Sequence, residues 1–248
     1  MGKVSGLNER LFVGSADLSG DVGALSKIAE IRNQQIVTGL NKSAQERINL
    51  LRDGSLAYTA FFDADSEHPV LSALAGVPTV YTWCTAPTAG AVTASLVATQ
   101  TDYPFNRGAD GSLVLSPTAE SAAYGIEWGN LLTNGAQAFA TDGSGTAIDD
   151  VHPVFGLTST AHGLAFYVHA LSLGSGNPVL TVEDSADNVT FAAVSGATTT
   201  FGTPESDRVQ VGGTVRRYLK LVVSGTFTDL VVAVAVVRYL NNPNTTAG

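Results

Sequence analysis

The side chains that most often carry chemistry are few in this chain and widely spaced. The four histidines are His68, His152, His162 and His169. No two of them stand four residues apart, so the helical His-x-x-x-His pattern of zinc sites is absent. His169 lies in an apolar alternating segment, where a packed histidine is more common than a metal ligand. Cys84 is the single cysteine, which excludes a disulfide within the chain and suits a small buried hydrophobe.

Two oxygen-rich segments have the ligand types that hard cations prefer. Residues 149–152 read Asp-Asp-Val-His, and Asp184, Asp187 and Asn188 fall in one turn. Solvated loops and turns use the same residue types for local hydrogen bonds, and this is the more common outcome. We therefore predict no metal site.

The one basic cluster is Arg216, Arg217 and Lys220. On a strand, Arg216 and Lys220 share one face and Arg217 points the other way. Protection of an edge strand, or an ion pair at an interface, is favoured over a phosphate site. No nucleophile stands in a recognisable elbow and no glycine-rich phosphate loop precedes a helix. We expect a protein that is not an enzyme and that has no cofactor.

The composition favours sheets and turns. The chain has 248 residues, of which 44% are hydrophobic and only 14% charged, against a usual quarter. Glycine occurs 26 times. So low a charge fraction has two explanations, a large core or a surface covered by other subunits, because interface centres are poor in charge.

The net charge of −9 is unevenly distributed. Residues 1–150 hold 8 lysines and arginines against 16 aspartates and glutamates, a balance of −8; residues 151–248 hold 5 against 6, a balance of −1. Binding of nucleic acid through its phosphates needs cations, so this balance argues against it. It fits a nucleic acid that passes without adhering, or an acidic surface that serves solubility.

No segment predicts export or a membrane span. The first twenty residues lack the apolar core of a signal peptide. The longest apolar run, Leu230–Val237, is too short to cross a bilayer. We expect a protein made in a cytoplasm, with no membrane partner.

The stretch from Ile36 to Phe62 predicts a strand, a loop, a short helix and a second strand. Ser43 and Glu46 form a capping box, so we predict a helix over residues 43–52. Asp53-Gly54 would end that helix, and residues 56–62 alternate as a strand does. A second short helix is predicted over residues 68–74.

The rest of the chain predicts strands separated by turns. The main predicted strands are 11–13, 77–84, 92–101, 112–117, 124–128, 164–173, 179–183, 190–194, 208–211, 215–223 and 230–240. Turn signals recur about every eight to twelve residues in the second half, as in a β-sandwich. We predict an all-β fold with one or two short helices, and a central position for residues 230–237.

Residues 130–150 are rich in glycine, alanine and threonine and read as a long loop or linker. We place a soft domain boundary there. The first predicted domain covers residues 1–150 and includes the helix near 43–52. The second covers residues 151–248 and is a β-sandwich domain or an extension of the first.

Several short motifs, in this order, resemble the major tail tube proteins of long-tailed (siphovirus-type) actinobacterial phages. In the first half they are Leu18-Ser19-Gly20-Asp21, Thr38 to Ala44, Glu46-Arg47-Ile48, Asp53 to Leu56, Phe61-Phe62, His68 to Leu71, Leu96 to Gln100, Arg107-Gly108 and Glu127-Trp128-Gly129. In the second half they are Asp184 to Asp187, Arg217-Tyr218-Leu219 and the final valine-rich strand. The resemblance covers nearly the whole chain.

This resemblance implies a virion structural protein with a tail-tube-like β fold. Such subunits close into rings, expected to be hexameric, and the rings stack into a tube that conducts DNA during ejection. The implied partners are other copies of the chain, the tape measure, the tail terminator and the distal tail proteins. Double-stranded DNA would pass the lumen without specific binding, and the tail would assemble in the bacterial host cytoplasm.

The N-terminal arm and residues 39–53 are the expected contacts between subunits or between stacked rings. The candidate interface residues are Leu11, Phe12, Asn41, Lys42, Arg47 and Arg52. Two alternatives stay open: a capsid decoration protein or another virion part, and a carbohydrate-binding β-sandwich. In the last case the aromatic residues available to stack on sugars are Tyr167, Phe191, Tyr218 and Tyr239.

Overall fold

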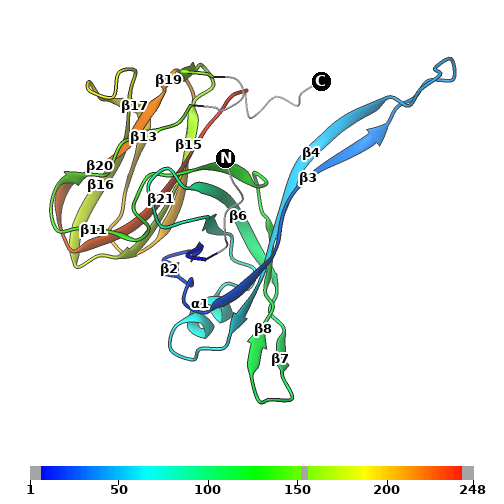
Figure 1. The fold of residues 1–248 in the computed structure, drawn as a ribbon, viewed down its shortest axis with the longest axis horizontal. Coiled ribbons are helices and arrows are strands. Elements are labelled where there is room, and N and C mark those ends of the chain that lie inside the picture. Colours follow the sequence, from blue (N-terminus) through cyan, green and yellow to red (C-terminus); the bar gives the residue numbers. More distant parts are fainter. Residues whose placement is uncertain (1–6, 152–155, 242–248) are drawn as a thin grey trace.

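The structure is a computed structural model that describes residues 7–151 and 156–241. Within these residues it is built of antiparallel strands and one short helix, so the all-β prediction is confirmed (Figure 1). The strands before the helix are β1 (Arg10–Val13), β2 (Ala16–Asp17), β3 (Val22–Ile36) and β4 (Arg47–Phe61). The helix α1 (Glu67–Ala73) agrees with the predicted helix over residues 68–74.

The remaining strands fall on either side of residue 151. Those before it are β5 (Thr79–Cys84), β6 (Val92–Asp102), β7 (Phe105–Arg107), β8 (Leu113–Leu115), β9 (Thr118–Ser121), β10 (Glu127–Leu131), β11 (Gln137–Phe139), β12 (Gly143–Ser144) and β13 (Ile148–Asp149). Those after it are β14 (Ser159–Thr160), β15 (Leu164–Ser172), β16 (Ser175–Ser185), β17 (Ala192–Thr200), β18 (Ser206–Val211), β19 (Val215–Arg216), β20 (Tyr218–Thr228) and β21 (Leu230–Arg238).

One 14-stranded sheet runs through both halves of the chain. Its main order is β18-β15-β21-β10-β6-β9-β4-β8-β7, and β1 joins it by pairing with β5. β21 lies inside the sheet, between β15 on one side and β10 and β11 on the other. Apolar side chains cover both of its faces, as its continuous valine-rich sequence requires. The predicted central position of this strand is confirmed.

A second sheet packs on the β15–β21 end of the first. Its order is β12-β20-β16-β17, and β13 also pairs with β20. The core between the sheets contains Phe166, Leu180, Leu221 and Val234, all fully buried. This is the sandwich arrangement that the turn spacing predicted for the second half.

Residues 130–150 are not the open linker that their composition predicted. They contain β11, β12 and β13, which pair with β21 and β20 of the second half. The reason is that the long strands offer backbone partners, which outweigh the weak strand propensity of glycine and alanine. The division of the chain near residue 150 stays a prediction.

The predicted helix over residues 43–52 is wrong. Residues 47–52 belong to β4, which pairs with β3 from Val22↔Ala60 at one end to Ile36↔Arg47 at the other. The backbone N–H of Glu46 donates to Thr38 Oγ1 at 2.9 Å rather than to Ser43, so the capping box does not form. A helix of this length is marginal alone, whereas pairing with a strand of 15 residues satisfies the whole segment.

The first half has a core of its own beneath the hairpin base. Leu11, Leu56, Tyr58, Leu96 and the helix residue Leu71 are all buried in it. Through Leu71, α1 covers one side of this core. The wide sheet and the two cores therefore fix the point from which β3 and β4 leave the body.

Candidate assembly interface

The β3–β4 hairpin extends far beyond the sheet to which it belongs (Figure 1). β4 pairs with β9 only at residues 55–57 and with β8 only at residues 60–61. Farther out it pairs with β3 alone among the described residues, and the outer edge of β3 has no partner strand there. Each strand has 15 residues, which gives a length of about 50 Å at the usual rise.

The turn at the end of the hairpin is held by its own polar groups. The N–H of Val37 donates to the carbonyl of Glu46 at 2.9 Å, and the N–H of Lys42 donates to the carbonyl of Gly39 at 3.1 Å. Lys42 Nζ and Glu46 Oε1 form an ion pair at 2.9 Å. The turn is thus shaped without a partner molecule.

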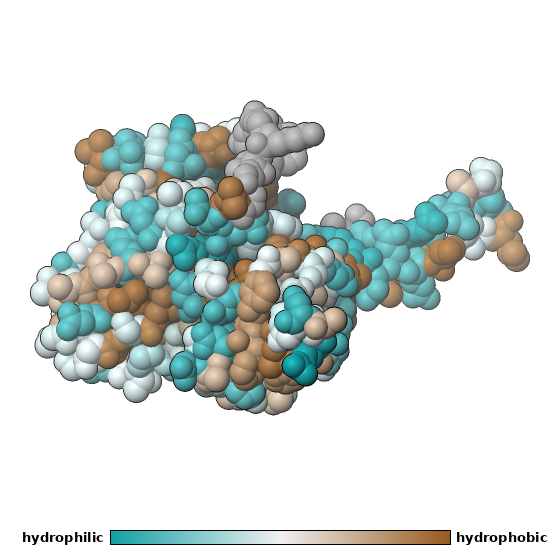
Figure 2. Space-filling view, turned by 60° about the horizontal axis from the view of Figure 1, so that its bottom comes forward, coloured by the Kyte–Doolittle hydropathy of each residue, from teal (hydrophilic) through white to brown (hydrophobic). Residues whose placement is uncertain are grey.

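The apolar side chains of the outer hairpin, in contrast, are uncovered. The exposed ones are Ile36, Val37, Leu40, Ile48, Leu50 and Leu51. Leu51 is 80% exposed and Leu40 is as exposed as in an extended peptide, at 109%. Hydrophobic atoms gather at the far end of the hairpin in Figure 2, beyond a largely hydrophilic stem.

These side chains stand on both faces of the hairpin. Ile36 lies opposite Arg47, and Gln35 lies opposite Ile48. Between Asn49 and Arg52 the strand β4 has one more residue than β3, so this bulge places Leu51 on the same face as Ile48, while Ile36 shares the other face with Arg47. A partner that covers the first face would bury Ile48 and Leu51 together.

The structure separates the six predicted interface residues. Asn41, Lys42 and Arg47 are exposed at the end of the hairpin. Leu11 and Phe12 are 2% and 0% exposed, so their assignment to an interface was wrong. Residues 11–13 were predicted as a short strand, and they form β1, which pairs with β5 and packs into the cores.

The sixth residue, Arg52, lies where the hairpin meets the body. Its Nη2 is 3.7 Å from Glu127 Oε1, and its side chain is 27% exposed. Close to Arg52, the backbone of Ile126 passes β4 at a short distance. A Cβ on Gly54 would lie 2.7 Å from the backbone N of Ile126. This close crossing explains why the sequence has glycine there.

Glu127 itself is a buried carboxylate that joins the two halves of the chain. It accepts hydrogen bonds from the hydroxyls of Tyr167 and Tyr239, the latter at 2.8 Å. Arg208 donates to it through Nη2 at 2.7 Å and Nε at 3.1 Å. Glu127 and Arg208 side chains are only 1% and 4% exposed, so each depends on the other for its charge.

The tyrosines of this cluster have pKa values shifted by the same surroundings. Burial raises the pKa of Tyr167 well above its usual range, and the charge of Glu127 adds to the shift. Burial acts against the cation of Arg208, but Tyr167 and Glu127 raise its pKa overall. The cluster is a buried structural network in which the charges of Glu127 and Arg208 face each other.

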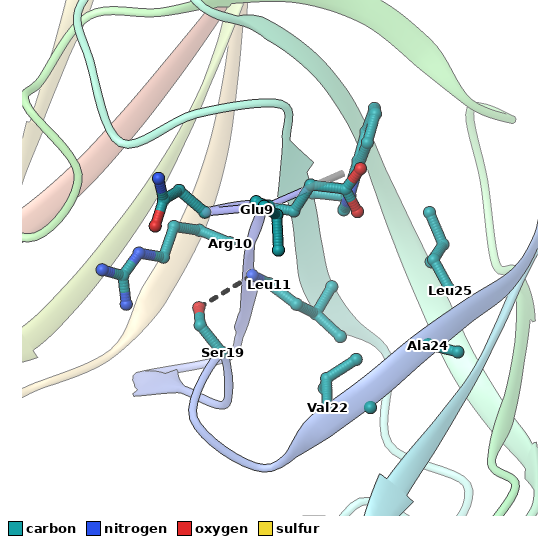
Figure 3. A pocket seen from close by; sticks show the side chains of 11 residues that line it. Glu9, Arg10, Leu11, Ser19, Val22, Ala24 and Leu25 are labelled. Atoms are coloured by element: carbon teal, nitrogen blue, oxygen red, sulfur yellow. Dashed lines mark hydrogen bonds between the residues drawn. The ribbon is translucent and has the colours of Figure 1, made fainter. Parts of the chain in front are cut away.

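A pocket of about 330 Å³ lies between β1 and the start of β3 (Figure 3). Glu9 accepts a hydrogen bond from Trp83 Nε1 at 3.0 Å, and Ser19 Oγ accepts one from the N–H of Leu11 at 3.0 Å. In Figure 3, Glu9 and Arg10 extend in opposite directions from the strand. The polar groups do not converge on one point, so the pocket has no arrangement for catalysis.

The oxygen-rich segments are occupied by hydrogen bonds and ion pairs within the chain. Asp149 pairs with Arg217, and Asp150 pairs with Arg238 at 2.9 Å. Asp187 accepts from the N–H groups of Val189 and Thr190, which lowers the pKa of its carboxyl to about 2. Among the described residues no group of His, Cys, Asp and Glu side chains has the geometry of a metal site. His152 lies outside these residues.

The basic cluster of the second half is also paired within the chain. Arg216 lies 3.8 Å from Asp184, and Lys220 lies 3.1 Å from Glu183. Arg217 pairs with Asp149 as noted. These cations stabilise the sandwich and leave little free positive charge for phosphate.

The two remaining predictions about single side chains are settled by burial. His169 is fully buried, with Nδ1 2.8 Å from the carbonyl of Gly14 and Nε2 2.9 Å from Thr82 Oγ1. Burial lowers the pKa of His169 to about 4, so it packs as a neutral ring. Cys84 is buried as predicted. The single helix of the described residues is far too short to cross a membrane.

Sequence reasoning missed the hairpin itself. Three register shifts interrupt the β3–β4 pairing, between Val22 and Ala24, Leu25 and Lys27, and Arg32 and Gln34. These bulges break the alternation of apolar residues, which hides the strand from a search for period two. The sequence still shows a group of apolar residues near Ile48. Their spacing fits one face of a helix, and this led to the helix prediction.

Comparisons with known proteins find no close relative. Neither a protein-family model nor a curated protein matches the sequence. Among solved structures, the Dit (gp 19.1) protein of phage SPP1, described as a paradigm of the hub adsorption apparatus in phages that infect Gram-positive bacteria, is similar at a TM-score of 0.34 and 11% identity, over 92% of this chain and 98% of that one. A chain of the phage p2 baseplate in its activated conformation is similar at a TM-score of 0.36 and 7% identity, over 94% of this chain and 99% of that one. TM-scores this low do not establish a common fold, so the function is inferred from the chain's own geometry.

Proposed function

We propose that this chain is a structural protein of a virion tail, whose copies associate into rings that stack into a tail tube. The observation that carries the proposal is the β3–β4 hairpin. It is paired along its whole length, it projects from the body, and its outer part bears six exposed large apolar side chains. Exposed apolar surface of this kind on an ordered element marks a contact with another protein.

The balance between the cost of ordering the hairpin and the burial it achieves supports self-assembly. Fixing the backbone of each residue costs about 1–2 kcal/mol, and the outer hairpin buries almost nothing in its own chain to offset that cost. Burial of Leu40 and Leu51 against another copy would return about 1.5–3 kcal/mol for each side chain. The hairpin is therefore completed by an assembly.

The two ends of the large sheet support a ring. Its main path ends at β18 on one side and at β7 on the other, and each of these strands has one partner strand in the described part of the chain. Two different free edges on one subunit allow a head-to-tail contact, which forms a ring when the rotation closes. In this proposal the ring is a hexamer, as the sequence resemblance implies.

The charge distribution supports a conduit for DNA. The first half carries a balance of −8. All five lysines and arginines of the second half are in ion pairs with acidic side chains, all within the described residues. A lumen with few free cations repels the phosphates and allows a duplex to move without specific binding.

The carbohydrate-binding alternative loses support from burial. Tyr167 and Tyr239 are 0% and 7% exposed and bind Glu127. Tyr218 lies under Arg217, with the guanidinium carbon 4.9 Å from the ring centroid, and Phe191 lies under Lys220 at 4.2 Å. The four aromatic residues do not form one open platform for a sugar ring.

Negative-stain electron microscopy at rising protein concentration tests the proposal. We expect rings and hollow tubes for the wild type, and their loss in Leu40→Ser and Leu51→Ser. Val189→Ser is the matched control, because Val189 is 81% exposed but lies in the second half, away from the hairpin. Rings that never stack would contradict the tube, and a monomer at all concentrations would contradict self-assembly. A compact closed particle without a pore would point to the decoration protein.

A further inference from the structure

A second apolar surface lies at the base of the β7–β8 hairpin, where four aromatic rings meet. The ring centroids of Tyr103 and Phe105 are 4.9 Å apart, and those of Phe62 and His68 are 5.2 Å apart. Phe62 and Phe105 lie 5.9 Å from each other, which closes the group. His68 Nδ1 is 3.0 Å from the hydroxyl of Tyr103, so the ring of His68 is fixed in place.

This group continues onto the exposed face of β8. Phe105 lies opposite Leu115, and Leu113 stands two residues before Leu115, so Phe105 and Leu113 share a face. Phe105 is 45% exposed and Leu113 is 36% exposed. We call Phe62, His68, Tyr103, Phe105 and Leu113 the aromatic patch.

Acidic residues lie close to the residues of the aromatic patch in the chain. Asp63 and Asp65 lie in the loop that leads to α1, and Asp102 and Asp110 flank β7. Arg107 is the one cation on this short hairpin. The end of the β3–β4 hairpin has the opposite balance, with Lys42 and Arg47 against Glu46. The two surfaces are thus complementary in both hydrophobicity and charge.

The two surfaces do not meet within one chain. Figure 1 shows the β7–β8 hairpin and the β3–β4 hairpin leaving the body in different directions. We propose that the end of the β3–β4 hairpin of one copy docks on the aromatic patch of a second copy. This inference rests on the proposed function, since it names the surface that receives the hairpin during self-assembly. The contact joins two different surfaces, so it propagates from copy to copy.

Disulfide cross-linking between two single-cysteine additions tests the docking. Leu40→Cys on one population is mixed with Leu113→Cys on the other, under mild oxidation at a concentration that permits assembly. The native Cys84 is fully buried and does not compete. The control mixture pairs Leu40→Cys with Val189→Cys, which is more exposed than Leu113 but lies in the second half.

We expect the Leu40 and Leu113 mixture to form disulfide-linked dimers at least tenfold faster than the control mixture. Equal rates in an assembling protein would overturn the docking surface and leave hairpin-driven assembly intact. If the wild type forms no assembly at any concentration, both the docking and the proposed function fail.

A pair of serine variants provides an independent test that needs no cross-link. Phe61 on β4 and Phe105 on β7 lie on either side of β8, but Phe61 lies opposite Val114 and Phe105 opposite Leu115, so the two rings face opposite sides of the sheet. We expect Phe105→Ser to raise the concentration needed for assembly about tenfold, and Phe61→Ser, at a site that is 58% exposed, to change it less than twofold. The reverse order would overturn the docking.

Discussion

β21 and the outer β3–β4 hairpin both consist of strands with apolar side chains, but those of β21 are buried and those of the hairpin are exposed. β21 has neighbours on both sides and buried side chains packed on both faces, and its residues from Val232 to Val236 are at most 1% exposed. The outer hairpin has similar side chains, but Leu51 is 80% exposed. In β21 the chain covers its own apolar residues, whereas in the hairpin it presents them. The difference separates residues that stabilise the subunit from residues that are available to a partner.

The junction of these two regions should respond most strongly to mutation. Glu127→Ala would leave Arg208 charged and buried without its carboxylate, at a cost of about 4 kcal/mol in the free energy of unfolding. Denaturant titration measures the loss. Glu120→Ala on strand β9 of the same sheet is the control, because Glu120 is exposed. Equal effects of the two variants would show that the cluster does not join the halves.

A leucine in each region compares them directly. Leu230→Ala in β21 removes a fully buried side chain and should cost about 3 kcal/mol through lost burial and a cavity. Leu51→Ala should change the stability of the dissociated subunit by less than about 0.5 kcal/mol. For assembly the order should reverse. Relative to the stability that each variant loses, Leu51→Ala should weaken assembly more than Leu230→Ala. A large effect of Leu51→Ala on the dissociated subunit would mean that the hairpin packs on its own body.

A pH titration separates the body from the hairpin in another way. Glu67 at the start of α1 is fully buried, and burial, aided by the nearby charge of Asp21, raises its pKa from 4.5 to about 7. The folded state therefore holds the proton more tightly than the unfolded state, and this stabilisation is complete below about pH 4.5 and lost as the pH rises to about 7.

Since one pKa unit corresponds to about 1.4 kcal/mol, we expect stability to fall by about 3 kcal/mol across that window relative to Glu67→Gln. The difference between the two titrations isolates this group from the other carboxyls. Parallel curves for the wild type and Glu67→Gln would contradict the buried acid. The Lys42–Glu46 pair of the hairpin is exposed, so it should add little to the stability of the subunit.

The smallest effect is expected where the hairpin crosses the body. Gly54→Ala places a methyl group against the backbone of Ile126, which has little room to move, and should cost about 1–2 kcal/mol. Gly20→Ala is the control, because a Cβ there meets no atom within 4 Å. If Gly54→Ala is as mild as the control, the crossing is looser than the structure indicates and the hairpin is free to swing.

The same comparison explains what the sequence could and could not predict. The second half was predicted well because strands such as β15 and β21 have long apolar patterns that only a buried sheet satisfies. The hairpin was missed because bulges interrupt its pattern and Ser43 and Glu46 imitate a helix start. In the proposed assembly its apolar residues contact another copy of the chain, and no pattern within one chain could locate that contact. Leu11 and Phe12 failed for the reverse reason, since a short apolar segment does not reveal which strand will pair with it.

The pairing of β10 with β21 also sets an order of events during synthesis. Asn130 lies opposite Val236, so the large sheet stays incomplete until nearly the whole chain has left the ribosome. The β3–β4 hairpin needs only residues 22–61, and such local pairing is fast compared with long-range closure. During translation residues 22–61 are thus available for pairing before the strands that complete the body have been made. A nascent chain therefore benefits from the acidic balance of its first half, which keeps neighbouring chains on a polysome apart until folding is finished.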